Sequence, residues 1–239
     1  MAREQLSDAA AYTWHEFAER QQLAAALAGH VAGRLSKAIA ARGTAFLAVS
    51  GGTTPAKFFT ALSNIPIAWD KVKVTLVDER FVPPSSPRSN AGLVAANLLQ
   101  NAAAAANFVP LYHAAATIEG AAVSDSEALQ VLPWPLDVVV LGMGTDGHTA
   151  SFFPDADNLA RLLDPSSQRI VLPVHAASAG EPRLTLSLAR IINAAFIALH
   201  IEGAEKRTAF EAALGAGARK PIRAVLDATQ KPVEVFWAP

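Results

Sequence analysis

The chain has no cysteine among its 239 residues. Disulfide bridges, thiolate zinc sites and a cysteine nucleophile are therefore excluded. Net charge is also nearly absent, because 20 lysine and arginine residues balance 21 aspartate and glutamate residues. This balance gives no overall attraction for a polyanion, so we do not expect a nucleic-acid partner.

Long hydrophobic runs are missing as well. The longest apolar stretches, residues 102–106 and 136–143, fall far short of the roughly 20 residues that span a bilayer. Residues 1–17 carry charges and lack the apolar centre of a signal peptide. We therefore expect no membrane partner and a cytoplasmic location.

The composition is that of a globular protein. The chain is 51% hydrophobic and 17% charged, which is enough apolar material for a sizeable core. No long linker, internal repeat or low-complexity segment interrupts it. We therefore predict one domain over residues 1–239.

Apolar runs that suit buried strands alternate with segments that suit helices. Several of these strands are apolar on both faces, which is typical of a parallel sheet covered by helices. The sequence therefore predicts an α/β protein with a Rossmann-like, mostly parallel sheet and helices on both faces. Strands clustered within 169–201 predict a small antiparallel addition. The expected helices are 14–41, 54–64 (with Thr54 as N-cap), 91–100, 117–129 and 204–214, and the expected strands are 44–50, 73–79, 107–113, 136–142, 169–174, 183–187, 195–201 and 233–237.

Three of the predicted strands end in glycine or polar residues, at 50–52, 78–80 and 142–148. Ligands of open parallel sheets bind at the carboxyl ends of the strands. We therefore expect these three segments to share one site.

The first segment, SGGTTP at 50–55, suits an anion. Ser50, Gly51, Gly52 and Thr53 stand between a strand and a helix start, where backbone N–H groups can face a phosphate. A tight turn with a hydroxyl cap is the alternative. No Walker A pattern surrounds Lys57.

Ser50 could also be read as a hydrolase nucleophile. AVSGG resembles a nucleophile elbow whose first glycine is replaced by Ala48, with Asp146 and His148 as further triad members. Two residues spaced i, i+2 in one loop are poor triad partners for each other, so the sequence disfavours this alternative.

The second segment, VDER at 77–80, offers Arg80 as a planar, bidentate ligand for an anion. Asp78 or Glu79 would orient Arg80 or bind sugar hydroxyls. A solvated surface ion pair is the alternative. Asn90, after Ser89, is by itself no more than a helix-cap candidate.

The third segment, GMGTDGH, contains the G-x-G-x-x-G pattern of dinucleotide-binding loops. Pro154 follows too soon for the long helix that such a loop opens, which disfavours that reading although Asp164 stands near the expected acidic position. The glycines instead predict a bend that presents Asp146 and His148, with His148 as general base and a nearby carboxylate fixing its tautomer. A structural histidine is the alternative, and a metal site lacks further ligands at recognisable spacing.

Cations follow later in the chain. Lys206 is predicted in the first turn of a helix, where it opposes the helix dipole unless an anionic ligand lies there. A solvated surface lysine is the alternative. Arg183 begins another strand, and Arg223 is a weaker candidate.

Together and in this order, the motifs resemble the 6-phosphogluconolactonase family. The resemblance implies an α/β fold shared with glucosamine-6-phosphate deaminases and sugar-phosphate isomerases. It implies hydrolysis of 6-phospho-D-glucono-1,5-lactone to 6-phosphogluconate, in the oxidative pentose phosphate pathway, without metal or organic cofactor. The matching segments are SGGTTP (50–55), VDERFVP with SN (77–90), GMGTDGHTASFFP (142–154), RLTLS (183–187), GAEK (203–206) and PIRAV (221–225).

The resemblance also assigns residues. His148 matches the general base, and Arg80 and Lys206 match substrate-binding cations. The expected partner is a small phosphorylated sugar lactone, bound by a monomer or weak homodimer. The full expected site has Asp146 beside His148 as catalytic residues, and Ser50, Gly51, Gly52, Thr53, Asp78, Arg80, Asn90, Gly144, Arg183 and Lys206 as substrate-binding residues.

Two alternatives remain within the resemblance. One is a deaminase or isomerase of amino-sugar phosphates. Those deaminases carry F-N-E-P after a similar D-G-H loop, whereas this chain has S-F-F-P, with Phe153 in the place of the glutamate. The other is a non-enzymatic sugar-phosphate sensor, although such regulators usually carry a DNA-binding segment for which this chain has no basic stretch.

Overall fold

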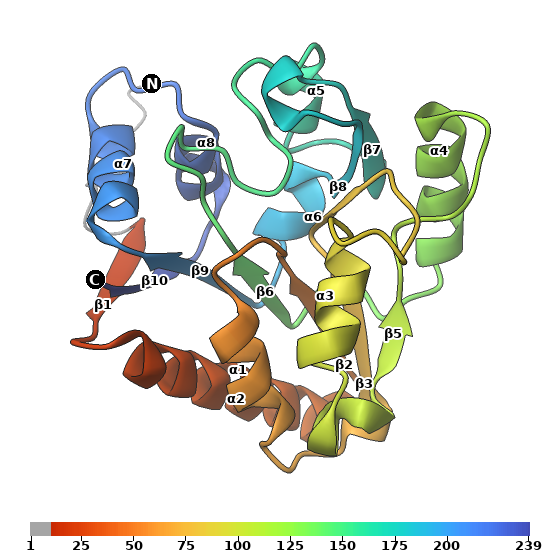
Figure 1. Ribbon diagram of the computed structural model, residues 1–239, viewed down its shortest axis with the longest axis vertical. Coiled ribbons are helices and arrows are strands. Elements are labelled where there is room, and N and C mark those ends of the chain that lie inside the picture. The colour runs from red at the N-terminus through yellow and green to blue at the C-terminus, as the bar shows by residue number, and fades with distance from the viewer. Residues whose placement is uncertain (1–10) are drawn as a thin grey trace, which may run out of the picture.

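Residues 11–239 are described by a computed structural model (Figure 1). Its centre is a seven-stranded sheet in the order β1-β10-β9-β6-β2-β3-β5, and every neighbouring pair is parallel. The predicted parallel α/β sheet is therefore confirmed. The strands are β1 (Tyr12–Glu16), β2 (Ala45–Val49), β3 (Val72–Leu76), β5 (Asn107–Val109), β6 (Val138–Leu141), β9 (Phe196–Glu202) and β10 (Val233–Ala238).

A second, three-stranded antiparallel sheet is formed by β4 (Asp78–Arg80), β8 (Arg183–Leu186) and β7 (Val171–Val174), in the order β4-β8-β7. The predicted antiparallel addition is confirmed, but its membership differs. The strand predicted at 195–201 is β9 of the main sheet, and β4 takes its place.

The strand predicted at 73–79 is in fact two strands in different sheets. Val77 separates them: its N–H donates to the carbonyl of Val49 in β2, and its own carbonyl accepts from Leu186 in β8. The chain therefore passes from one sheet to the other at a single residue. The sequence of the apolar run gives no signal that the chain leaves one sheet and joins the other.

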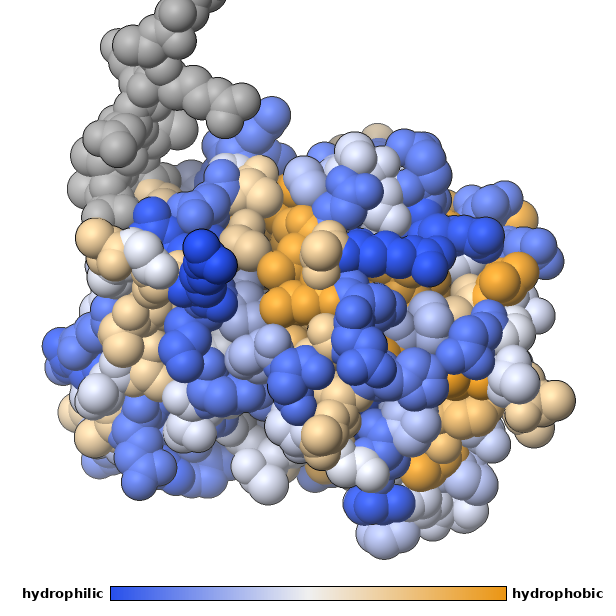
Figure 2. Space-filling model, turned by 90° about the horizontal axis from the view of Figure 1, so that it is seen from above, coloured by the Kyte–Doolittle hydropathy of each residue, from blue (hydrophilic) through white to orange (hydrophobic). Residues whose placement is uncertain are grey.

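Helices cover both faces of the main sheet, as predicted. In Figure 1, α1 and α2 lie below the sheet, and α6 and α8 lie above it. From above, apolar side chains gather at the centre of the face and hydrophilic side chains surround them (Figure 2). The helices are α1 (Arg20–Arg42), α2 (Ala56–Ser63), α3 (Asn90–Asn97), α4 (Ile118–Leu129), α5 (Leu159–Leu162), α6 (Leu188–Ile192), α7 (Ala204–Leu214) and α8 (Pro221–Ala228).

The first helix was predicted to begin too early. Residues 12–16 form the edge strand β1, which pairs in parallel with β10, and α1 begins only at Arg20. The rest of this predicted helix is confirmed, and Leu23, Leu27 and Leu35 on one side of it are fully buried. Long-range strand pairing overrides the helical pattern at 14–16. Helices α5, α6 and α8 were not predicted.

Buried side chains of both sheets and of the helices form one continuous hydrophobic core. Within residues 11–239, no helix is long and apolar enough to cross a membrane.

Glu79 joins β4 to the start of α3. Its side chain is fully buried, and its two oxygens accept four hydrogen bonds. Oε1 accepts from the N–H groups of Arg80 and Asn90, and Oε2 accepts from the Ser89 hydroxyl and the Ala91 N–H. Burial raises the pKa of Glu79, and the four hydrogen bonds oppose that rise.

We predict that Glu79→Gln lowers the free energy of unfolding by about 1–3 kcal/mol, because an amide nitrogen replaces an acceptor oxygen and leaves buried donors unpaired. Urea denaturation at neutral pH measures the change. The control is Glu127→Gln on the exposed side of α4, which we expect to stay within about 0.5 kcal/mol of the unaltered protein. Equal stabilities of the two variants would contradict this role of Glu79.

Candidate active site

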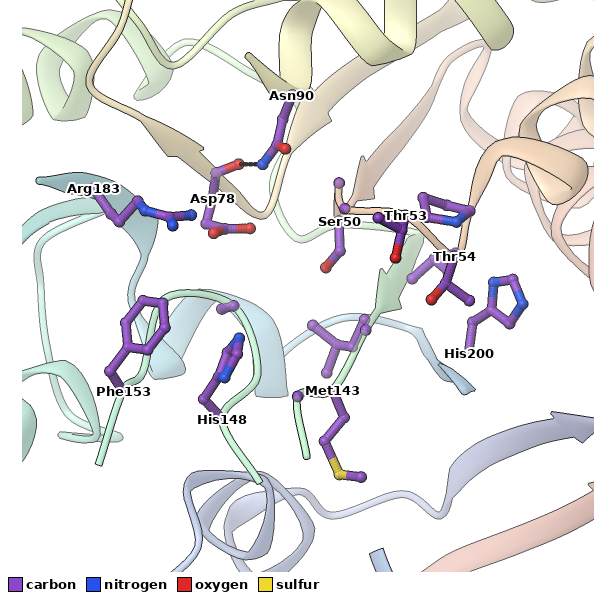
Figure 3. A pocket seen from close by; sticks show the side chains of 18 of the residues that line it. Ser50, Thr53, Thr54, Asp78, Asn90, Met143, His148, Phe153, Arg183 and His200 are labelled. Atoms are coloured by element: carbon purple, nitrogen blue, oxygen red, sulfur yellow. Dashed lines mark hydrogen bonds between the residues drawn. The ribbon is translucent and has the colours of Figure 1, made fainter. Parts of the chain in front are cut away.

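A cavity of about 330 Å³ lies where β2 and β6 end and β4 begins. Figure 3 shows side chains from the loops after these strands pointing into it. The structure thus brings the three predicted loops together at the carboxyl edge of the sheet. The predicted residues that line the cavity are Ser50, Gly51, Gly52, Thr53, Asp78, Arg80, Asn90, Gly144, His148, Arg183 and Lys206.

Asp146 lies behind His148 and does not line the cavity. Its Oδ1 is 2.7 Å from Nδ1 of His148 and also accepts the His148 backbone N–H at 3.1 Å. The i, i+2 spacing that was judged unfavourable for this pair therefore does allow a carboxylate–imidazole hydrogen bond. With Asp146 ionised, Nδ1 carries the proton and Nε2 is left as the acceptor.

The imidazole of His148 is also held by its surroundings. The ring of Phe153 stacks on it, with centroids 4.5 Å apart and planes at 30°. A Cβ on Gly144 would lie 2.4 Å from two atoms of the imidazole, so only glycine allows this approach. The ring is thus fixed by Asp146 at its edge and by Phe153 on its face.

The loop that carries His148 closes on itself. The N–H of Gly144 donates to the carbonyl of His148, and the N–H of Gly147 donates to the carbonyl of Gly144. The next helix, α5, has only four residues and begins at Leu159. This loop therefore lacks the long helix that a dinucleotide-binding fingerprint requires.

The loop after β2 approaches Asn90 closely. A Cβ on Gly51 would lie 1.9 Å from Oδ1 of Asn90, so the position requires glycine. The Asn90 amide donates to the carbonyl of Asp78 at 2.8 Å (dashed line in Figure 3), and the Asp78 carboxylate accepts from Ser151 at 2.6 Å. Ser89 caps α3, so Asn90 is not the helix cap. Its side chain instead bonds to Asp78 and lies against Gly51 in the loop after β2.

Backbone donors of the same loop remain available. Among residues 11–239, the N–H groups of Gly51, Gly52 and Thr53 have no protein acceptor. Unpaired N–H groups of a glycine-rich turn form a concave surface that suits an anion.

Several buried polar atoms that line the cavity have no partner within the described residues. They are the hydroxyl of Ser50, the amide oxygen of Asn90, and Nε of both Arg80 and Arg183. Buried polar groups in proteins are normally hydrogen-bonded. The cavity therefore suits a ligand with several polar groups.

The two arginines are held by backbone carbonyls. Arg80 donates to the carbonyl of Arg88, and Arg183 donates to that of Ala179. The Arg183 guanidinium also lies over Phe153, 5.5 Å from the ring centroid. Burial lowers the pKa of Arg183, and the negative charge of Asp78 opposes that shift.

Lys206 approaches the cavity from the first turn of α7. Its Nζ donates to the hydroxyl of Thr54 at 3.1 Å. The prediction that Thr54 is the N-cap of α2 is therefore wrong. Pro55 occupies the cap position, and the Thr54 hydroxyl accepts from Lys206 instead. Burial lowers the pKa of Lys206, and the charge of Glu202 opposes that shift.

Two sequence candidates lie outside the cavity. The Glu79 carboxylate accepts hydrogen bonds from the first residues of α3. Arg223 bonds to Asp227 and to the carbonyl of Leu214. Within residues 11–239, no group of three or more potential metal ligands is present. Other residues line the cavity that the sequence motifs did not mark as site residues, among them Thr54, Met143, Ser178 and His200.

We predict that Gly144→Ala breaks the His148–Asp146 hydrogen bond, because the added methyl group needs the space of the imidazole. Crystal structures of the variant should show the Nδ1–Oδ1 distance beyond about 3.5 Å. Gly29→Ala in α1 is the control, since nothing lies within 4 Å of its added Cβ. An unchanged distance in the first variant would contradict the argument.

The fold and the site together fit one class of protein: an α/β enzyme whose cavity, at the carboxyl edge of a parallel sheet, is lined by cations and unpaired polar groups. Residues 18–237 match the family of glucosamine-6-phosphate isomerases and 6-phosphogluconolactonase. The chain is 77% identical over 239 residues to the 6-phosphogluconolactonase of Mesorhizobium japonicum, and the match covers 100% of both chains. It is 54% identical over 227 residues to that of Rhizobium meliloti, covering 94% of this chain and 98% of the relative.

A solved structure agrees with these relatives. The crystal structure of a 6-phosphogluconolactonase from Shewanella baltica matches with a TM-score of 0.92 and 40% identity, covering 95% of this chain and 98% of that one. The protein therefore belongs to the glucosamine-6-phosphate isomerase/6-phosphogluconolactonase family. Its similarity over nearly the whole length is to enzymes named 6-phosphogluconolactonase.

Proposed function

We propose that this protein hydrolyses 6-phospho-D-glucono-1,5-lactone to 6-phosphogluconate, with His148 as the general base. The activity is supported by the family and by the 77% identity to a 6-phosphogluconolactonase. The observation that carries the mechanism is the His148–Asp146 pair beside a cavity lined by cations.

The substrate phosphate binds at the loop of residues 51–54. This loop offers unpaired N–H groups, the Lys206 ammonium of α7 bonds to its Thr54, and Arg80 adds a second cation in the same cavity. The lactone ring then extends toward His148. Charge-assisted hydrogen bonds to the phosphate hold the substrate in this direction.

His148 activates water through Nε2. As the water oxygen attacks C1, its proton passes to Nε2 and the carbonyl oxygen becomes negative. When the C1–O5 bond breaks, the imidazolium returns the proton to the ring oxygen. Asp146 stabilises the imidazolium and keeps the ring oriented, in the manner of a catalytic carboxylate–histidine pair.

Arg183 is our candidate for stabilising the negative oxygen. It packs against Phe153, the ring that stacks on His148, and its Nε has no protein acceptor. Gly144 is a poor candidate for an oxyanion donor, because its N–H is already bonded to the His148 carbonyl.

An amino-sugar-phosphate deaminase or isomerase is the competing function. Phe153 argues against it, because an apolar ring stacked on His148 stands where those deaminases carry a glutamate. A pH-stat assay of acid release from freshly generated 6-phosphogluconolactone, run beside an ammonia assay with glucosamine 6-phosphate, separates the two. Ammonia release without acid release would overturn the proposal, and binding of both compounds without turnover would indicate a sensor.

We further propose that the chain acts as one domain over residues 1–239, as a cytoplasmic monomer or weak homodimer. The catalytic steps above use only side chains, backbone and water, so no metal or organic cofactor is part of the proposal. Nucleic acid and membranes are not among its proposed partners.

We predict that His148→Ala lowers kcat by about 10²–10⁴-fold with little change in KM, because it removes general-base assistance but no phosphate contact. Initial rates of lactone hydrolysis, corrected for spontaneous opening, measure this. His175→Ala is a matched control, since His175 is also a partly exposed histidine bonded to a carboxylate, that of Glu119. A His148 variant with the turnover of the control would remove His148 from the mechanism.

We predict that Arg80→Ala raises KM by about 10–100-fold, because it removes a charged contact to the phosphate. The same kinetic assay measures it, with Arg161→Ala as a control at an exposed arginine outside the cavity. A fall in kcat at unchanged KM would instead assign Arg80 to the transition state.

A further inference from the structure

His200 is a buried titratable side chain that the mechanism above does not use. It lies on β9, is 2% exposed, and lines the cavity. In Figure 3 it lies on the side of Thr53 and Thr54, whereas Arg183 and Phe153 lie on the opposite side. His200 therefore faces the end of the cavity where the phosphate is proposed to bind.

A carboxylate stands behind His200. Its Nε2 is 3.2 Å from Oε1 of Glu202, two residues along the same strand. Glu202 does not line the cavity, and its Oε2 is 3.4 Å from Nε of Arg20 in α1. His200 thus connects this carboxylate to the lining of the cavity.

Lys206 shares this end of the cavity with the negative charge of Glu202. Lys206 is the cation bonded to the Thr54 hydroxyl, and it interacts with the negative charge of Glu202. Burial raises the pKa of Glu202, but the interactions with His200, Arg20 and Lys57 outweigh burial and lower the pKa overall. An ionised carboxylate so close to a phosphate site weakens the attraction for a dianion.

Two aromatic residues also lie near His200. Phe58 of α2 meets its ring edge-on with centroids 6.1 Å apart, and Phe236 of β10 is its register partner in the sheet. The charged group bonded to His200 is therefore Glu202 on its own strand. Lys206 on α7, Lys57 on α2 and Arg20 on α1 interact in turn with that carboxylate.

We propose that His200 is a specificity-determining residue for the phosphate group, which takes up a proton from solvent when the dianionic phosphate binds. The imidazolium donates from Nε2 to Glu202 and neutralises that carboxylate, so the Lys206 charge acts on the phosphate in full. This inference rests on the proposed function only for the position of the phosphate. It makes affinity for the phosphate fall as pH rises through the range in which histidine loses its proton.

The test is calorimetric binding of 6-phosphogluconate to the full chain at about pH 7, in buffers of different ionisation enthalpy. We expect net proton uptake by the unaltered protein and clearly less uptake by His200→Gln. The variant should also bind about three- to tenfold more weakly at pH 6 and equally well at pH 8. His175→Gln, at an exposed histidine away from the cavity, is the matched control.

A second variant keeps the test decisive if His200→Gln does not fold. Glu202→Gln removes the charge that His200 neutralises, so we expect tighter binding than in the unaltered protein at pH 8 and less proton uptake. Equal proton uptake in the unaltered protein and in the folded variants would overturn the proposal. If the unaltered protein does not hydrolyse the lactone, the proposed function is wrong. The same titration with inorganic phosphate would then still test the role of His200.

Discussion

The backbone of Val77 holds the two sheets together at the point where the site forms. Its N–H bonds to β2 of the parallel sheet and its carbonyl bonds to β8 of the antiparallel sheet. Because the chain passes to the second sheet at Val77, Asp78 and Arg80 line the same cavity as the loops that follow β2 and β6. The cavity therefore owes its position to two backbone hydrogen bonds at one residue, and Glu79 then ties the same segment to α3.

Partly desolvated cations are the second constraint. Burial lowers the pKa of both Arg183 and Lys206, so each is held in a place that disfavours its charge. Such a placement costs free energy that an anionic ligand offsets on binding. Glu202 differs, because its interactions outweigh burial and lower its pKa, and its negative charge lies close to Lys206 and His200. Affinity for substrate thus depends on how the charge of Glu202 is balanced.

The sequence predicted many of the residues that line the cavity, because they follow strand ends, where glycine and polar residues interrupt apolar runs. It predicted the strand β9 but not the role of His200, since one histidine in an apolar strand looks like a core residue. It left open whether Asp78 or Glu79 faces the site, because a charged triplet does not show which carboxylate turns inward to bond to the start of a helix; Asp78 lines the cavity and Glu79 bonds to α3. It missed β1, whose pairing with β10 joins residues more than 200 positions apart.

The central claim is that the cavity has a phosphate end at Lys206 and a reacting end at His148. A crystal structure of the complex with 6-phosphogluconate tests it most directly. The account predicts the phosphate within hydrogen-bond distance of Lys206 Nζ and the N–H groups of Gly52 and Thr53, with the C1 carboxylate beside Nε2 of His148. A product bound in the opposite direction, or outside this cavity, would contradict the account.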